Sequence, residues 1–146
     1  IANMTETSNY LREQKGPEFA LIACLERYKK AQETGEYEGL VVFSVRMQVE
    51  VDFILANGGE VIWVETNDDI RYERYIQHMR EGEIAITKTE LMNQEALQWQ
   101  PQPGIAPEVQ MNIQYVKAHA TRIFTNEDND IKGFNDRAKK LMSEIV

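Results

Sequence analysis

Residues 61–74 constrain the fold most, because they have the pattern of a buried strand that leads directly into a capped helix. The run from Val61 to Val64 is apolar throughout, as expected for a parallel strand covered on both faces. Asn67 is a favourable N-cap, and two aspartates follow it. Arg71 and Arg74 then share one helical face. Ligands of α/β proteins bind at the carboxyl ends of parallel strands, so this segment predicts a phosphate-binding site.

Composition limits the class of protein. The chain has 146 residues, enough for one domain with its own core. Its net charge of −8 argues against a general nucleic-acid-binding surface but permits a local basic site. The single cysteine, Cys24, lies in an apolar stretch and is expected to be a buried, reduced thiol. No apolar run is long enough to cross a membrane and no signal-peptide pattern is present, so we expect a cytoplasmic protein.

Predicted strands alternate with predicted helices along the chain. Strands are expected over residues 40–45, 61–65 and 121–125, and helices over 4–14, 17–34, 47–56, 68–79, 88–98, 108–119 and 130–145. The strongest local helix signal is the capping box formed by Thr87 and Glu90. Alternation of this kind favours an α/β fold with a parallel sheet and helices on both faces.

Three stretches carry a likeness to a known family. Leu11, Arg12 and Glu13 before Gly16 are similar to a Leu-Arg-Glu-x-x-Gly segment. Residues 41–46, followed by a Glu-Val pair at 50–51, resemble a strand that ends in Asp-Gly-Ile-Arg. Residues 61–74, the Arg80 loop and residues 87–95 resemble a strand, a helix and a mobile lid around 75–100. Together these stretches resemble the P-loop nucleotide kinases, in particular the dephospho-CoA kinase and adenylate-kinase-like branch.

The resemblance implies one domain over residues 1–146 with the three-layer parallel sheet of the P-loop kinases. It implies phosphoryl transfer from ATP, with Mg²⁺, to a nucleotide or dephospho-CoA-type small molecule. Arg71, Arg74 and Arg80 would bind the nucleotide phosphates, and Arg12 and Arg46 would bind the substrate. No catalytic residue and no metal ligand can be assigned. The histidines, the serines and the acidic pairs lack the spacing of a metal site or a nucleophile.

Two departures from the family pattern change the expectation of a complete and active kinase. The phosphate-cradling Gly-x-x-x-x-Gly-Lys-Ser/Thr loop is absent, and no Gly-Lys pair occurs in the chain. Phe43 and Ser44 stand where the family has an acidic residue and a glycine, and a phenyl ring can neither bind a metal nor accept a proton. We therefore expect a sheet that is incomplete at the N-terminus, completed by an upstream strand or by another subunit of a homo-oligomer, and a chain that is inactive alone.

Alternatives stay open for function and for the arginines. A non-catalytic nucleotide-binding or interaction domain could have kept the scaffold and lost the chemistry. Arg71 and Arg74 could instead pair with acidic neighbours on a solvated helix face. Arg80 and Arg12 could be plain exposed residues, whereas Arg46 follows a predicted strand and so faces the expected ligand crevice.

Overall fold

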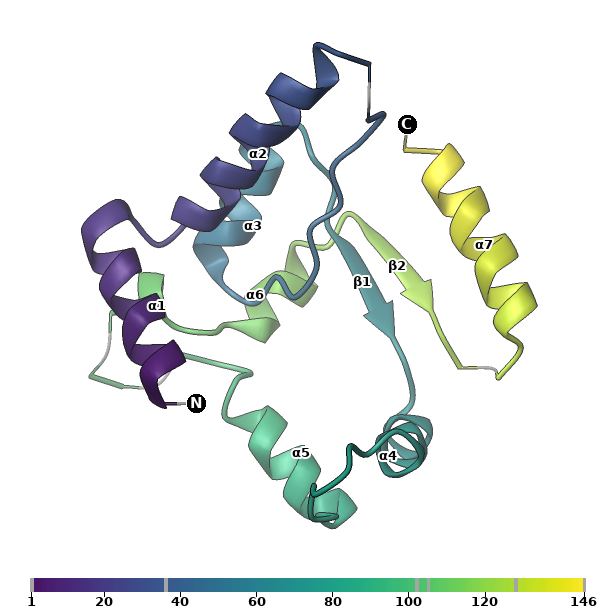
Figure 1. Cartoon of the computed structure of the whole chain (residues 1–146). Coiled ribbons are helices and arrows are strands. Elements are labelled where there is room, and N and C mark those ends of the chain that lie inside the picture. The colour runs from purple at the N-terminus through teal and green to yellow at the C-terminus, as the bar shows by residue number, and fades with distance from the viewer. Residues whose placement is uncertain (1, 36, 102, 105, 128, 146) are drawn as a thin grey trace.

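The computed structural model describes residues 2–35, 37–101, 103–104, 106–127 and 129–145. Within them the protein is mixed α/β, with helices placed around a small parallel sheet (Figure 1). In chain order the elements are α1 (Ala2–Lys15), α2 (Phe19–Gln32), α3 (Gln48–Ala56), β1 (Ile62–Glu65), α4 (Asp68–Gln77), α5 (Lys88–Ala96), the 3₁₀ helix η1 (Pro107–Val109), α6 (Ile113–Ala118), β2 (Arg122–Thr125) and α7 (Ile131–Ser143).

Strands β1 and β2 pair in parallel, as the sequence predicts. Their register places Ile62 opposite Arg122 and Glu65 opposite Thr125. Three α-helices, α4, α5 and α6, lie in the connection between them, which is the kind of crossover that parallel strands require. Helix α7 follows β2 and packs against it, with the rings of Phe124 and Phe134 meeting edge to face at 5.4 Å.

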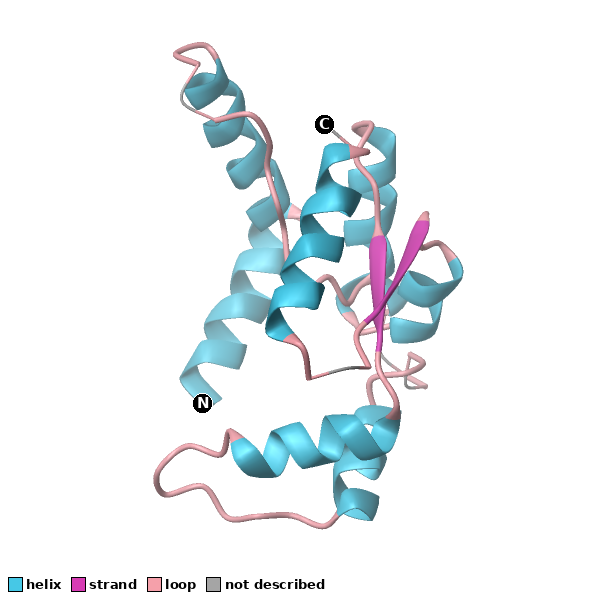
Figure 2. Cartoon of the chain, turned by 90° about the vertical axis from the view of Figure 1, so that its right-hand side faces the viewer, coloured by secondary structure: helices cyan, strands magenta, loops and turns pink. Residues whose placement is uncertain are grey.

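The prediction of a strand over residues 40–45 is wrong. The segment has no regular secondary structure and makes no strand pairing with the described residues, and Figure 2 shows β1 and β2 as the strands of the described chain. Val41 and Phe43 are 64% and 84% exposed. β-rich composition favours an extended backbone, but a strand also needs a neighbour to take its hydrogen bonds. The described residues therefore contain a two-stranded parallel sheet.

The predicted N-terminal caps of α4 and α5 are confirmed, because in each the cap side chain accepts a hydrogen bond from a backbone N–H of the first helical turn. Asn67 Oδ1 accepts a hydrogen bond from Asp69 N over 2.8 Å at the start of α4. Thr87 and Glu90 form the predicted capping box of α5. The helix predicted over 108–119 is instead divided into η1 and α6, because Asn112 caps α6 by accepting from Tyr115 N over 3.0 Å.

The core lies where α3, β1 and α6 meet. Val51, Val61 and Val116 are buried there, and the partly buried Val45 and Trp63 pack against them. This small cluster joins the segment before α3 to the first strand. Burial of apolar side chains of this kind is the main favourable contribution to folding.

Cys24 is exposed, so the prediction of a buried thiol is wrong. It lies on α2, in which Leu21 is the buried residue. An apolar helical stretch predicts burial only if another element covers that face, and the sequence pattern does not show which faces are covered. No helix in the described part of the chain is both long and apolar enough to span a membrane.

Candidate functional site

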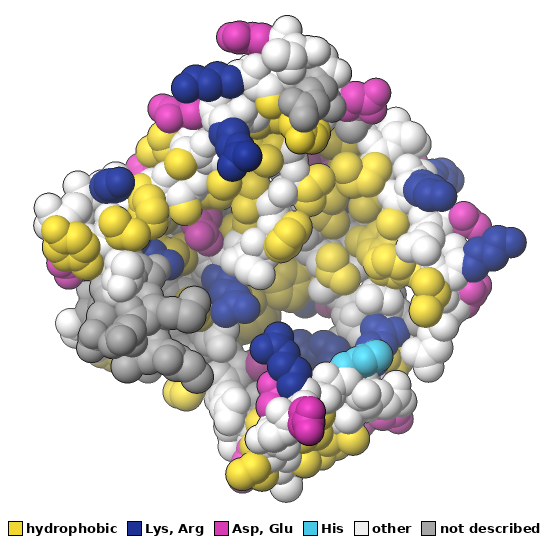
Figure 3. Space-filling view, viewed as in Figure 1, with side chains coloured by type: hydrophobic (Ala, Val, Ile, Leu, Met, Phe, Trp, Pro, Cys, Tyr) yellow, Lys and Arg dark blue, Asp and Glu magenta, His cyan; other side chains and the backbone are white. Residues whose placement is uncertain are grey.

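A cavity of about 330 Å³ opens between α1, the start of α3 and the segment around η1. It brings together Arg12 and Arg46, the two residues predicted to bind the substrate. The cavity is lined by Arg12, Ser44, Arg46, Met47, Glu50, Val109 and Met111. In Figure 3 the face seen in Figure 1 is hollowed below its centre, above α4 and α5, and Lys and Arg side chains gather around that hollow.

The wall that carries Arg46 is held by hydrogen bonds on both sides. The carbonyl oxygen of Arg46 accepts from Asn112 N over 2.7 Å, which joins the approach to α3 to the start of α6. Glu50 Oε2 accepts from the backbone N–H groups of Arg46 at 2.8 Å and Met47 at 3.0 Å. Met47, the N-cap residue of α3, is buried. These contacts satisfy backbone groups that the helix start would otherwise leave unpaired.

Ser44 has a left-handed backbone, with φ of 66°. It is the one residue other than glycine with positive φ in the described ranges, and this conformation costs a residue with a Cβ about 1–2 kcal/mol. The turn separates Phe43, which points to solvent, from Val45, which packs on the core. Glycine suits such a position best, and the resemblance places a glycine there.

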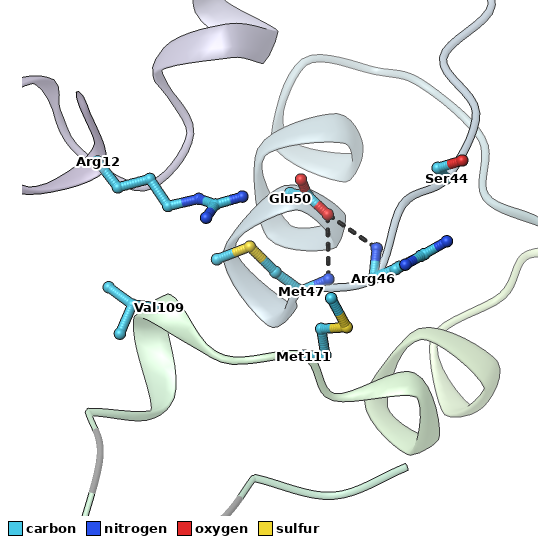
Figure 4. Close-up of a pocket in the computed structure, with 7 residues that line it drawn as sticks. All are labelled: Arg12, Ser44, Arg46, Met47, Glu50, Val109 and Met111. Atoms are coloured by element: carbon cyan, nitrogen blue, oxygen red, sulfur yellow. Dashed lines mark hydrogen bonds between the residues drawn. The ribbon is translucent and has the colours of Figure 1, made fainter. Parts of the chain in front are cut away.

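Charged and apolar side chains share the cavity. In Figure 4 the Arg12 guanidinium points towards Glu50, whereas the Arg46 side chain extends away from Arg12 along the opposite side. Met47 and Met111 form a flexible apolar floor, because thioether side chains adapt to irregular shapes. Guanidinium groups suit phosphate and carboxylate oxygens, so the cavity suits a small anionic ligand with an apolar part.

The other three predicted arginines lie outside this cavity. Arg71 pairs with Glu95 and, at 3.4 Å, with Asp68. Arg74 Nη1 donates to the carbonyl oxygen of Asn126 over 3.0 Å and so ties α4 to the end of β2. Arg80 is exposed in the loop between α4 and α5. The structure thus separates the predicted nucleotide-binding arginines from the predicted substrate-binding arginines.

A second concavity, of about 430 Å³, lies at the carboxyl end of β1, where the strand-to-helix pattern predicts a ligand. It is lined by Glu65, Thr66, Asn67, Asp68, Asp69, Lys88 and Glu127. Lys88 Nζ is 2.5 Å from Asp69 Oδ1 and offsets part of the negative charge. Carboxylates still predominate, so the local charge disfavours a phosphate at this position. The sequence signals this character, because the acidic residues directly flank the strand end.

The residues present do not fit Mg²⁺ at the position that the resemblance assigns to it. Phe43 offers no oxygen or nitrogen ligand, and its side chain is exposed. The described ranges contain no group of three or more His, Cys, Asp or Glu side chains placed to hold a metal ion. No step of a reaction is therefore assigned to a metal in this chain.

Comparison with known proteins leaves the family open. No family model, no curated protein and no solved structure matches this chain.

Proposed function

We propose that this domain binds the phosphate-bearing acceptor of an ATP-dependent small-molecule kinase-like protein, in the cavity between Arg12 and Arg46. The acceptor class is a nucleotide or a dephospho-CoA-type molecule. The observation that carries the proposal is that Arg12 from α1 and Arg46 from the segment before α3 line the same cavity. Each residue resembles a substrate-binding arginine of the P-loop nucleotide kinases.

The chemistry of the cavity supports an anionic ligand. Each charge-assisted hydrogen bond from a guanidinium to a phosphate oxygen contributes roughly 1.5–3 kcal/mol. A volume of about 330 Å³ lies at the lower end of the range for small-molecule sites. Val109, Met47 and Met111 give the remainder of the ligand an apolar surface. The backbone of Arg46 is already fixed, so its side chain alone has to be ordered when a ligand binds.

The same proposal assigns the donor nucleotide to Arg71, Arg74 and Arg80. Arg71 and Arg74 would exchange protein partners for phosphate oxygens, whereas Arg80 is exposed in its loop. Replacing Arg74 by alanine would then weaken ATP binding about tenfold or more if the contact is direct. Since the chain has no Gly-Lys phosphate cradle and carries Phe43 in place of an acid, we assign no residue to the chemical step.

A second candidate function is a non-catalytic interaction domain. It is favoured by the exposed apolar side chains that precede α3, among them Val41 and Phe43. Such side chains on a segment with unpaired backbone are typical of a surface that another polypeptide covers. This candidate predicts no affinity for nucleotides.

Calorimetric titration of AMP and dephospho-CoA at fixed salt tests the proposal. Arg12→Ala should weaken binding about tenfold or more, and Arg12→Lys should restore only part of it, because the planar fork is lost. Arg27→Ala is the matched control, since Arg27 is an exposed arginine of α2 outside the cavity. Equal affinities for the wild type and Arg12→Ala would contradict the proposal, and no binding by the wild type would favour the interaction domain.

A further inference from the structure

Among the described residues that line the Arg12–Arg46 cavity, Glu50 is the one carboxylate. Its two oxygens have different surroundings. Oε2 accepts the backbone N–H groups of Arg46 and Met47, at 2.8 and 3.0 Å. Within the described part of the chain, Oε1 takes part in no hydrogen bond or ion pair, and in Figure 4 it points away from the two capped amides. One oxygen is therefore structural and the other is available to a ligand.

A cation and a hydrogen-bond acceptor line this cavity, Arg12 and Glu50. Figure 4 shows the Arg12 guanidinium reaching towards Glu50 from α1. A ligand that contacts both groups has negative oxygens for Arg12 and a hydrogen-bond donor for Glu50. Inorganic phosphate carries P–OH donors, but contact with both groups would hold its negative charge directly against the carboxylate, which is unfavourable. A phosphate ester with a free hydroxyl group meets both requirements.

We propose that Glu50 is a specificity-determining residue that selects phosphate esters bearing a free hydroxyl, such as the ribose of a nucleoside monophosphate. This inference rests on the proposed binding of a phosphate-bearing acceptor at the same cavity. The physical reason is the cost of burying a donor or acceptor without a partner. A site built to accept a hydroxyl loses affinity when the ligand lacks it, because the carboxylate is desolvated without compensation.

Glutamine at position 50 separates the two roles of the side chain. In Glu50→Gln the amide oxygen keeps the two backbone N–H groups, because glutamine serves at this position of a capping box as glutamate does. The amide nitrogen then takes the place of Oε1, and it donates but does not accept. The variant should therefore keep the start of α3 and lose the acceptor that faces the cavity.

The test compares AMP with 2′,3′-dideoxyadenosine monophosphate by calorimetry at fixed salt. The wild type should bind AMP at least tenfold more tightly than the dideoxy form, and Glu50→Gln should reduce this ratio to within about twofold. Glu90→Gln is the matched control. It makes the same change at the same capping position of α5, outside the cavity, and should keep the wild-type ratio. Thermal unfolding followed by circular dichroism reports whether each variant is folded.

The outcomes separate this inference from the proposed function. Equal binding of the two nucleotides by the wild type would overturn the role of Glu50 and leave the phosphate site in place. A folded Glu50→Gln protein that keeps the wild-type ratio of AMP affinity to dideoxy-AMP affinity would also overturn the role of Glu50. Failure of the wild type to bind either nucleotide would overturn the phosphate site itself. Equal binding by the wild type overturns the role of Glu50 whether or not Glu50→Gln folds.

Discussion

Glu50 accepts a hydrogen bond from the backbone N–H of Arg46 over 2.8 Å, while the carbonyl oxygen of Arg46 accepts one from Asn112 N over 2.7 Å. The backbone at Arg46 is thus held from both sides, by α3 and by the approach to α6. Its guanidinium group nevertheless stays exposed. An arginine with a fixed backbone and an accessible charge is well placed to bind an anion at low entropic cost.

Val51 should contribute strongly to stability. It is fully buried, at 0% exposure, between α3, β1 and α6. Val51→Ala removes two methyl groups and leaves a cavity, so the free energy of unfolding should fall by about 2 kcal/mol. Val64→Ala is the matched control, because Val64 is 54% exposed and should change stability by less than about 0.5 kcal/mol. Urea unfolding measures both variants, and a similar loss in both would contradict this account of the core.

Arg74 should stabilise the link between α4 and the end of β2. Its Nη1 donates to the Asn126 carbonyl oxygen over 3.0 Å, and the side chain is half-buried. Arg74→Met keeps the aliphatic stem and removes the charged donor, so the free energy of unfolding should fall by about 1–3 kcal/mol. Arg27→Met, on an exposed face of α2, should leave stability almost unchanged. An Arg74→Met protein as stable as the wild type would show that this contact is unimportant.

The capping box of α5 should lower the pKa that is measured for the Glu90 carboxyl group. Hydrogen bonds from the backbone N–H and the hydroxyl of Thr87 lower the pKa of Glu90 below its ordinary value of 4.5. The ionised form is therefore favoured in the folded state. The stability that it contributes is fully present above pH 4.5 and is lost as the pH falls through the folded pKa.

Thr87→Ala removes the hydroxyl donor but keeps the backbone N–H, so the pKa of Glu90 should move part of the way back to the ordinary value. The loss of stability in acid should be correspondingly smaller than in the wild type. Titration of the Glu90 carboxyl carbon by NMR measures the shift directly. An unchanged pKa would show that the Thr87 side chain does not hold the carboxylate in solution.

Features that depend on a few neighbouring residues could be predicted from the sequence. The Asn67 cap and the Thr87–Glu90 capping box each form within three residues, and both are present. The parallel pairing of β1 with β2 was also predictable, because alternation of strands and helices along a chain favours a parallel sheet. In each case the sequence itself contains the partner or the constraint.

Features that depend on a distant partner could not be predicted. Residues 40–45 have strand composition, but nothing in their pattern shows whether a neighbouring strand pairs with them. Cys24 lies in an apolar stretch that the structure leaves uncovered. The grouping of Arg12 with Arg46, which line the same cavity, was suggested by the family resemblance, since neither spacing nor periodicity links α1 to the segment before α3. Glu50 was missed as a cavity residue. Its position three residues after the N-cap residue Met47 is nevertheless typical of a capping glutamate.

The most direct test of the central claim is to map where a phosphate-bearing ligand binds. Addition of AMP to the ¹⁵N-labelled protein should shift the backbone resonances of residues 44–50 and 109–111, which form the cavity walls. Residues 65–69, in the acidic concavity at the end of β1, should shift much less. The shifts at 44–50 should require about tenfold more AMP in Arg12→Ala. Shifts centred on residues 65–69, or shifts at 44–50 that are unaffected by Arg12→Ala, would contradict the assignment of the phosphate site to the Arg12–Arg46 cavity.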